Sequence, residues 1–148
     1  MGHAKSECEE LLNVLLPFAE ELLAKHGEFF PFAATMNNLG GIAHVAGYTG
    51  SEQPPSADVI ALLKGAFREG ARTSEYRATA LAYDVRVQSP TNNAKCDAVA
   101  VELDHADEYS VVVYFPYTVN ENRVEVGVPF AQEGSDEVFG QQPEEGGA

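Results

Sequence analysis

The strongest constraint on this chain is the spacing of its apolar residues between positions 78 and 130. Successive residues of a β-strand point to opposite faces of a sheet, so apolar residues at every second position predict strands. Residues 79–87, 98–104 and 124–130 alternate in this way, whereas 109–119 is apolar at nearly every position. The pattern predicts an antiparallel meander in which 109–119 is a central strand and 124–130 is an edge strand.

The first half of the chain alternates between helical and strand patterns. Apolar residues at helical spacing predict a helix over about 6–25 that ends at Gly27. The stretch from Phe30 to Met36 and the stretch from Ile42 to Tyr48 read as two strands joined by a glycine-containing turn. A second amphipathic helix is expected from Ser56 onwards.

These elements predict an α+β fold. Two helices are expected to pack on one face of an antiparallel sheet of about five to six strands, in the order α-β-β-α-β-β-β-β. This element order resembles that of profilin-like and roadblock-type domains. Residues 1–132 are interpreted as a single domain, and residues 133–148 as an acidic, flexible tail with an apolar island at Val138 and Phe139.

Small side chains are expected to gather on one face of this sheet. Alternation in the 78–100 hairpin suggests an alanine face covered by the helices, with larger residues on the other face; its members are Ala78, Ala80, Ala82, Ala98 and Ala100. An apolar face that no helix covers must be buried by something else. A homodimer through the uncovered face is therefore one hypothesis.

Charge limits the classes of partner. The chain has 23 acidic and 9 basic residues and a net charge of −14, which disfavours nucleic acid and anionic membranes and allows a basic protein partner. The sequence has no apolar run of membrane-spanning length, and its N-terminus, MGHAKSECEE, lacks the apolar segment of a signal peptide. Together with two cysteines in no paired pattern, these features predict a cytoplasmic protein.

An acidic cluster lies between two valine-rich strands, and it could bind a metal or form a hairpin tip. Its carboxylates are Glu102, Asp104, Asp107 and Glu108, and His105 lies among them. The ligand spacing of an EF-hand is absent, so a solvated hairpin tip is the preferred interpretation. We expect no metal or cofactor here, and we predict that these four carboxylates bind a partner.

A second group of polar residues suggests a ligand pocket between the second helix and the sheet. Asp84 and Arg86 lie two apart on one strand and therefore share a face, and His44 lies in another strand. These three residues are the predicted ligand-binding groups. A nucleophile–base pair of Cys96 with His44 or His105 is an open alternative, although no local motif supports it.

The leading functional hypothesis is a non-enzymatic binding or regulatory module that engages a protein partner, which its acidity suggests is basic. The chain has no P-loop, no dinucleotide-binding glycine motif and no nucleophile elbow. The alternative is a small-molecule-sensing or small hydrolytic domain that uses His44, Asp84 and Arg86.

Overall fold

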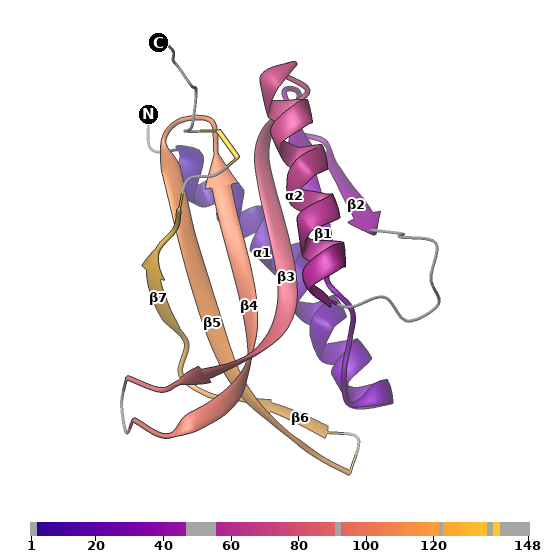
Figure 1. Cartoon of the computed structure of the whole chain (residues 1–148), viewed down its shortest axis with the longest axis vertical. Coiled ribbons are helices and arrows are strands. Elements are labelled where there is room, and N and C mark those ends of the chain that lie inside the picture. The colour runs from indigo at the N-terminus through magenta and orange to yellow at the C-terminus, as the bar shows by residue number, and fades with distance from the viewer. Residues whose placement is uncertain (1–2, 47–55, 91–92, 122, 136–137, 140–148) are drawn as a thin grey trace.

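A computed structural model describes residues 3–46, 56–90, 93–121, 123–135 and 138–139. The described residues form two helices and a single sheet (Figure 1). The helices are α1 (His3–His26) and α2 (Ser56–Arg72), and the strands are β1 (Phe32–Asn37), β2 (Ile42–Ala46), β3 (Tyr76–Gln88), β4 (Lys95–His105), β5 (Tyr109–Asn120), β6 (Arg123–Val126) and β7 (Phe130–Glu133). The order of helices and strands confirms the predicted α+β class.

The described sheet has seven antiparallel strands, where the sequence predicted five to six. The difference arises because the strand predicted over 124–130 divides into β6 and β7. Between them the Gly127 N–H donates to the Pro116 carbonyl at 2.7 Å, and Pro129 has no N–H to offer a neighbouring strand. As a result, β6 pairs with residues 117–120 of β5, and β7 pairs with residues 111–114.

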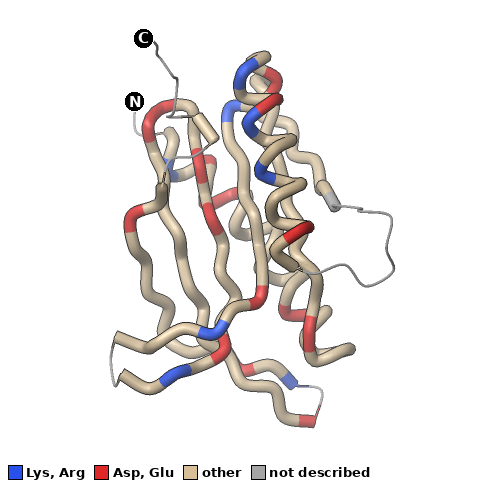
Figure 2. The backbone as a smooth tube through the Cα atoms, viewed as in Figure 1, with Lys and Arg blue, Asp and Glu red and all other residues tan. Residues whose placement is uncertain are grey.

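The strand order is β2-β1-β3-β4-β5-β6, with β7 also paired to β5. One edge of the sheet is therefore β2, which pairs with β1 alone among the described strands. The opposite edge is formed by β6 and β7, which carry Arg123, Glu125 and Glu133. Figure 2 shows that β1 and β2 carry no charged residue.

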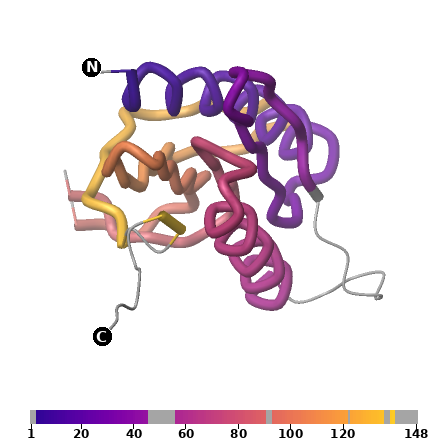
Figure 3. Tube along the Cα trace, turned by 90° about the horizontal axis from the view of Figure 1, so that it is seen from above, coloured from indigo at the N-terminus to yellow at the C-terminus, as the bar shows by residue number. Residues whose placement is uncertain are grey.

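The helices lie on opposite faces of the sheet, which corrects the expectation that they share one face (Figure 3). Alternate residues of β1 show this directly, because Ala34 belongs to the α1 core and Ala33 to the α2 core. The buried residues of α1 are Cys8, Leu11, Leu15, Ala19 and Leu23; those of α2 are Val59, Leu63, Phe67 and Gly70. Both sheet faces thus have a core, and α2 packs mainly over β3 and β1.

The predicted alanine face is split between the two faces of the sheet. Ala82 lies opposite Val101, whereas Ala100 lies opposite Tyr83, and residues opposite each other in an antiparallel pair share a face. Ala78, Ala80 and Ala82 therefore lie under α1, as expected, while Ala98 and Ala100 point to the α2 side. All five alanines are fully buried.

The predicted tail is in part attached to the domain. Glu133 belongs to β7, and the Gly134 N–H donates to the Ser110 carbonyl at 3.1 Å. Val138 is buried in the α2 core, where Phe139 also packs. The other residues after 135 lie outside the described part of the chain, so the flexibility of the tail stays a prediction. Neither described helix is long and apolar enough to cross a bilayer.

The approach of α2 to the sheet depends on Gly70. A Cβ built at Gly70 would lie 2.1 Å from Cε2 of Tyr76, at the start of β3, whereas a Cβ at Gly65 would have no atom within 4 Å. The two glycines share one helix and differ in what faces them. The ring of Tyr76 therefore packs directly against the backbone of α2 at Gly70.

We predict that Gly70→Ala lowers the free energy of unfolding by about 1–3 kcal/mol, because the added methyl group overpacks the contact with Tyr76. Gly65→Ala is the matched control and should raise it by about 0.5–1 kcal/mol, since alanine is the better helix former. Urea denaturation of both variants measures the difference. Equal effects of the two substitutions would contradict the close packing of α2 on β3.

Candidate functional site

Asp84 is the first polar residue on the α1 face of β3 beyond the buried core. Residues Ala78 to Ala82 of this strand are buried, and the burial weakens from Tyr83 onwards. Val99, which lies opposite Asp84 on β4, is fully buried. The carboxyl group therefore lies at the border between the α1 core and solvent, and a charge is costly in such a position without a partner.

The described side-chain partner of this carboxyl is a tyrosine, and the backbone of Val85 also gives it a hydrogen bond. The Tyr117 hydroxyl of β5 donates to Oδ1 of Asp84 at 2.7 Å. Burial raises the pKa of Asp84, and the nearby Asp97 and Glu28 add to the rise, whereas the bond from Tyr117 opposes it. Burial also raises the pKa of Tyr117, and the bond to Asp84 strengthens that effect. The pair thus joins a neutral donor to a carboxylate whose ionisation is disfavoured.

A pocket of about 280 Å³ opens beside Asp84. Its wall consists of Glu28, Phe29, Phe30, Ser56, Asp84, Val85, Arg86 and Asp97. The connection from α1 to β1 supplies Glu28 to Phe30, and Gly27 enables this exit from the helix with a φ of +76°. We call this cavity the Asp84 pocket.

The two phenylalanines of the Asp84 pocket differ in exposure. Phe29 is buried and packs edge-on against Phe32, with ring centroids 5.6 Å apart. Phe30 is 48% exposed. Phenylalanine is mostly a core residue; Phe29 and Phe32 follow this tendency, whereas Phe30 does not. An aromatic ring therefore stands partly bare at the pocket wall.

The charge around this pocket is negative. Arg86 pairs with Asp97 across the strands at 3.2 Å, and both side chains are largely exposed. An exposed pair of this kind contributes little to stability. With Glu28, Asp84 and Asp97 against Arg86, the wall holds three carboxylates and one guanidinium group, which leaves an excess of two negative charges at neutral pH when all are ionised.

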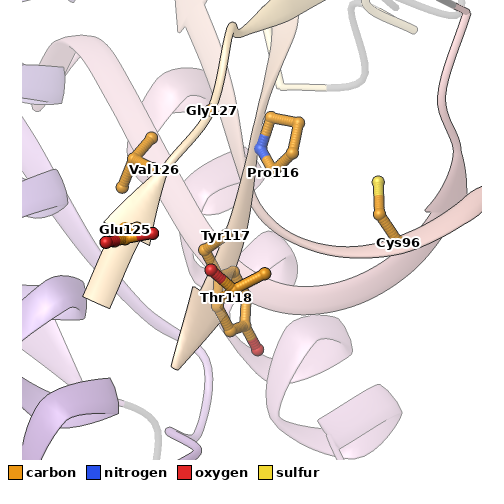
Figure 4. Close-up of a pocket in the computed structure, with 7 residues that line it drawn as sticks. All are labelled: Cys96, Pro116, Tyr117, Thr118, Glu125, Val126 and Gly127. Carbon is orange, nitrogen blue, oxygen red and sulfur yellow. The ribbon is translucent and has the colours of Figure 1, made fainter. Parts of the chain in front are cut away.

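A second pocket of about 290 Å³ lies at the C-terminal part of β5 (Figure 4). Pro116, Tyr117 and Thr118 line it from β5, Glu125 to Gly127 from the β6 side, and Cys96 from β4. Tyr117 thus belongs to the wall of this cavity while its hydroxyl is bonded to Asp84.

His44 is not brought to this site. It lies in β2 opposite Ala34, which in turn lies opposite Ala80. Asp84 is four residues further along β3, so His44 is displaced by roughly 13 Å along the strands and roughly 10 Å across them. Its exposed ring instead stands edge-on to Phe18 of α1, with centroids 6.0 Å apart. Asp84, Arg86 and Asp97 reach the Asp84 pocket from the α1 side of the sheet, and Ser56 is its residue from α2.

The four acidic residues predicted for partner binding divide into two groups. Glu102 has two partners on the α2 side. It accepts a hydrogen bond from the Tyr83 hydroxyl at 2.6 Å and forms a salt bridge with Lys64 at 3.2 Å. Asp104 is buried and accepts a bond from Ser110 at 2.8 Å. Asp107 and Glu108 are exposed in the turn between β4 and β5, so the hairpin itself forms as predicted.

A polar network that the sequence did not reveal lies near the N-terminus of α1. His105 is 3% exposed, and its Nε2 lies 2.7 Å from Oε1 of Glu7. The backbone N–H of Asp107 donates to Nδ1 of His105 at 3.0 Å, so the ring proton belongs on Nε2, which donates to Glu7. Arg77 binds the other oxygen of Glu7 at 2.7 Å.

A β-bulge aims Arg77 at this network. Met36 lies opposite Ala78, but Asn37 lies opposite Tyr76, so Arg77 is an extra residue in β3 and its side chain turns to the α1 side. The hydrogen bond from His105 lowers the pKa of Glu7 most, burial opposes it, and Arg77 lowers it further. Because both oxygens of Glu7 are engaged inside the protein, the network serves stability.

The nucleophile–base pairs considered from the sequence are not assembled. Cys96 and His105 are nine residues apart on the same strand, β4, which is roughly 30 Å. His105 is engaged by Glu7. The other cysteine, Cys8, is buried, and burial raises its pKa to about 12, so it carries no thiolate at neutral pH.

No group of three or more His, Cys, Asp or Glu residues in the described part of the chain is arranged to hold a metal ion. Comparisons with family models, with curated proteins and with solved structures found no match. The resemblance to profilin-like and roadblock-type domains therefore stays one of element order.

We predict that Asp84→Asn makes the folded protein more stable at neutral pH. A raised carboxyl pKa means that ionised Asp84 opposes folding above that pKa, and the opposition fades as pH falls towards the value of the unfolded chain. The gain from Asp84→Asn should therefore shrink in acid. Urea denaturation between pH 3 and pH 8 measures it.

Tyr117→Phe is the matched partner of this test. It removes the hydroxyl that donates to the half-buried carboxylate of Asp84, so it should lower the free energy of unfolding by about 1–3 kcal/mol. A loss of stability in Asp84→Asn at neutral pH would show instead that the pair is a structural one.

We predict the opposite pH dependence for Glu7. Its lowered pKa means that Glu7 stabilises the fold above the pKa of the unfolded chain, and that this stability is lost as pH falls through the folded pKa. Glu7→Gln should therefore be less stable than the parent at neutral pH, with a difference that closes in acid. Glu10→Gln, at an exposed position of α1, is the control and should change little. A constant deficit at all pH values would contradict the ionic role of Glu7.

Proposed function

We propose that this chain is a non-enzymatic, cytoplasmic binding module that holds a basic side chain of a protein partner in the Asp84 pocket. The observation that carries the proposal is a half-buried carboxylate at the pocket wall whose described hydrogen-bond partners, the Tyr117 hydroxyl and the Val85 backbone, are both neutral. A lysine or arginine placed there would give Asp84 a positively charged partner, and it would lower the pKa of Asp84.

The chemistry of the wall supports a cation rather than an anion or an apolar ligand. Three carboxylates face one guanidinium group, and Phe30 offers a partly exposed ring. Ammonium and guanidinium groups bind favourably over aromatic faces, and more strongly where they lose water. The net charge of −14 would also speed the approach of a basic partner at low salt.

The hairpin tip is the weaker candidate for the same role. Glu102 and Asp104 are engaged inside the domain, so the acidic turn offers Asp107 and Glu108 as exposed carboxylates. Side chains in water at a turn contribute little to binding unless they are desolvated. A concave site with a partly buried charge supports tighter binding.

The test uses short peptides of the form acetyl-Gly-Gly-X-Gly-Gly-amide, where X is lysine, arginine or glutamine. Binding is followed by amide chemical shifts of the labelled full-length protein at low and high salt. We expect the lysine or arginine peptide to change the amide chemical shifts of residues around Asp84, and its binding to weaken as salt rises. Its affinity for the Asp84→Asn variant should be about tenfold lower, equivalent to about 1.4 kcal/mol.

Asp107→Asn is the matched control, because it removes the same charge from the hairpin tip. If it weakens binding and Asp84→Asn does not, the tip is the binding surface and the proposal is wrong. Free lysine amide separates the alternative of a small-molecule sensor. Equal binding of the free amine and the peptide would favour that alternative, whereas preference for the peptide supports a protein partner.

A further inference from the structure

We propose that two copies of this chain join edge to edge through β2, in antiparallel register, with His44 of one copy opposite His44 of the other. The surface is separate from the Asp84 pocket. It consists of the open main chain of β2, the turn before it and the adjacent face of α1. The resulting dimer would have one continuous sheet.

No strand of the described residues pairs with the outer edge of β2. In the β1–β2 hairpin the Asn37 N–H donates to the Gly41 carbonyl at 2.9 Å. Bonded and non-bonded pairs alternate along an antiparallel ladder, so the pairs 36–42, 34–44 and 32–46 are the non-bonded ones. The N–H and C=O groups of Ile42, His44 and Ala46 therefore point away from β1, towards the open edge.

Charge selects a second copy as the occupant. From Phe29 to Ser51 the sequence has no Lys, Arg, Asp or Glu, although these four residue types make up 32 of the 148 residues. Figure 2 shows the resulting uncharged strands at this edge of an otherwise acidic molecule. Two chains of −14 repel each other over most surfaces, and an edge without charge allows close approach. A basic partner would gain nothing from this edge.

Apolar side chains support the contact beyond the main-chain bonds. Large hydrophobic residues stand exposed on and beside β2: Ile42 at 37%, Phe18 of α1 at 40%, and Leu39 in the preceding turn at 94%. Phe18 touches the ring of His44, and both Ile42 and His44 lie on the α1 side of the sheet. Exposed apolar residues next to an unpaired strand are the features that native proteins usually avoid.

Two-fold symmetry and full pairing of the strand together select the register. Each outward-facing residue must pair with an outward-facing residue of the other copy. Among the registers that satisfy this condition, the one that pairs the whole of β2 (Ile42–Ala46) places Ile42 opposite Ala46 and His44 opposite itself. The facing Cα atoms of a bonded antiparallel pair are about 5.5 Å apart, within the range that a disulfide can bridge. In the same register Val45 lies opposite Ala43 rather than opposite itself.

The experiment uses the full chain with Cys96→Ser, which leaves the buried Cys8 as its one native thiol. His44→Cys in this background should form a covalent dimer under mild oxidation, several-fold faster than Val45→Cys. A mixture of Ala43→Cys and Val45→Cys chains should cross-link with each other more than either does with itself. Sedimentation of the unmodified chain should show a reversible dimer, and His44→Asp should make it monomeric.

A monomer at all concentrations up to about 1 mM would overturn the proposal, and would leave β2 to a strand from another protein. Equal cross-linking of His44→Cys and Val45→Cys would overturn the register. Asp84→Asn should not change the dimer, and His44→Asp should not change peptide binding at the Asp84 pocket. The two proposals can therefore fail independently.

Discussion

The long pairing of β3 with β4 is the interaction on which the rest of this structure depends. It runs without interruption from Ala78–His105 to Gln88–Lys95, and the facing residues share a side of the sheet. This register places Ala80, Ala82 and Val101 under α1, and Leu81 under α2. A shift by one residue would exchange the two faces and put Glu102 and Asp104 into the α1 core.

The same ladder separates two polar groups on the α1 face. His105 is opposite Ala78, and Asp84 lies six residues further along β3, roughly 20 Å away. At the first position Glu7 and Arg77 complete an internally balanced network. At the second, Tyr117 gives Asp84 a hydrogen bond but no opposite charge. Such an imbalance destabilises the fold, and sites of binding commonly carry that cost.

Charge is unevenly distributed along the chain, and the fold turns this into two kinds of surface. The uncharged segment 29–51 contributes β1, the edge strand β2 and the aromatic wall of the Asp84 pocket. The acidic residues of the pocket are Glu28, just before that segment, and Asp84 and Asp97 of the β3–β4 hairpin. The pocket therefore forms where the uncharged and acidic parts of the chain meet, which explains why an aromatic ring and carboxylates share one wall.

The sequence by itself determined the α+β class, the order of the helices and strands and the place of the hairpin tip, because these follow from local periodicity and turn residues. It also found Asp84 and Arg86, two residues apart on one strand. It could not give the phase of one strand against the next, so Ala98 and Ala100 were assigned to the wrong face. Nor could it show that the helices lie on opposite faces.

Contacts between distant segments were decided by tertiary structure alone. Glu7 and His105 are 98 residues apart, and their bond depends on how α1 crosses the sheet. The bulge at Arg77 has no local signature, and the bond from Tyr117 to Asp84 joins β5 to β3 across β4. His44 was grouped with Asp84 by chemistry, but the strand order put it at the far edge. Periodicity reports which face a residue prefers, whereas proximity depends on register and strand order.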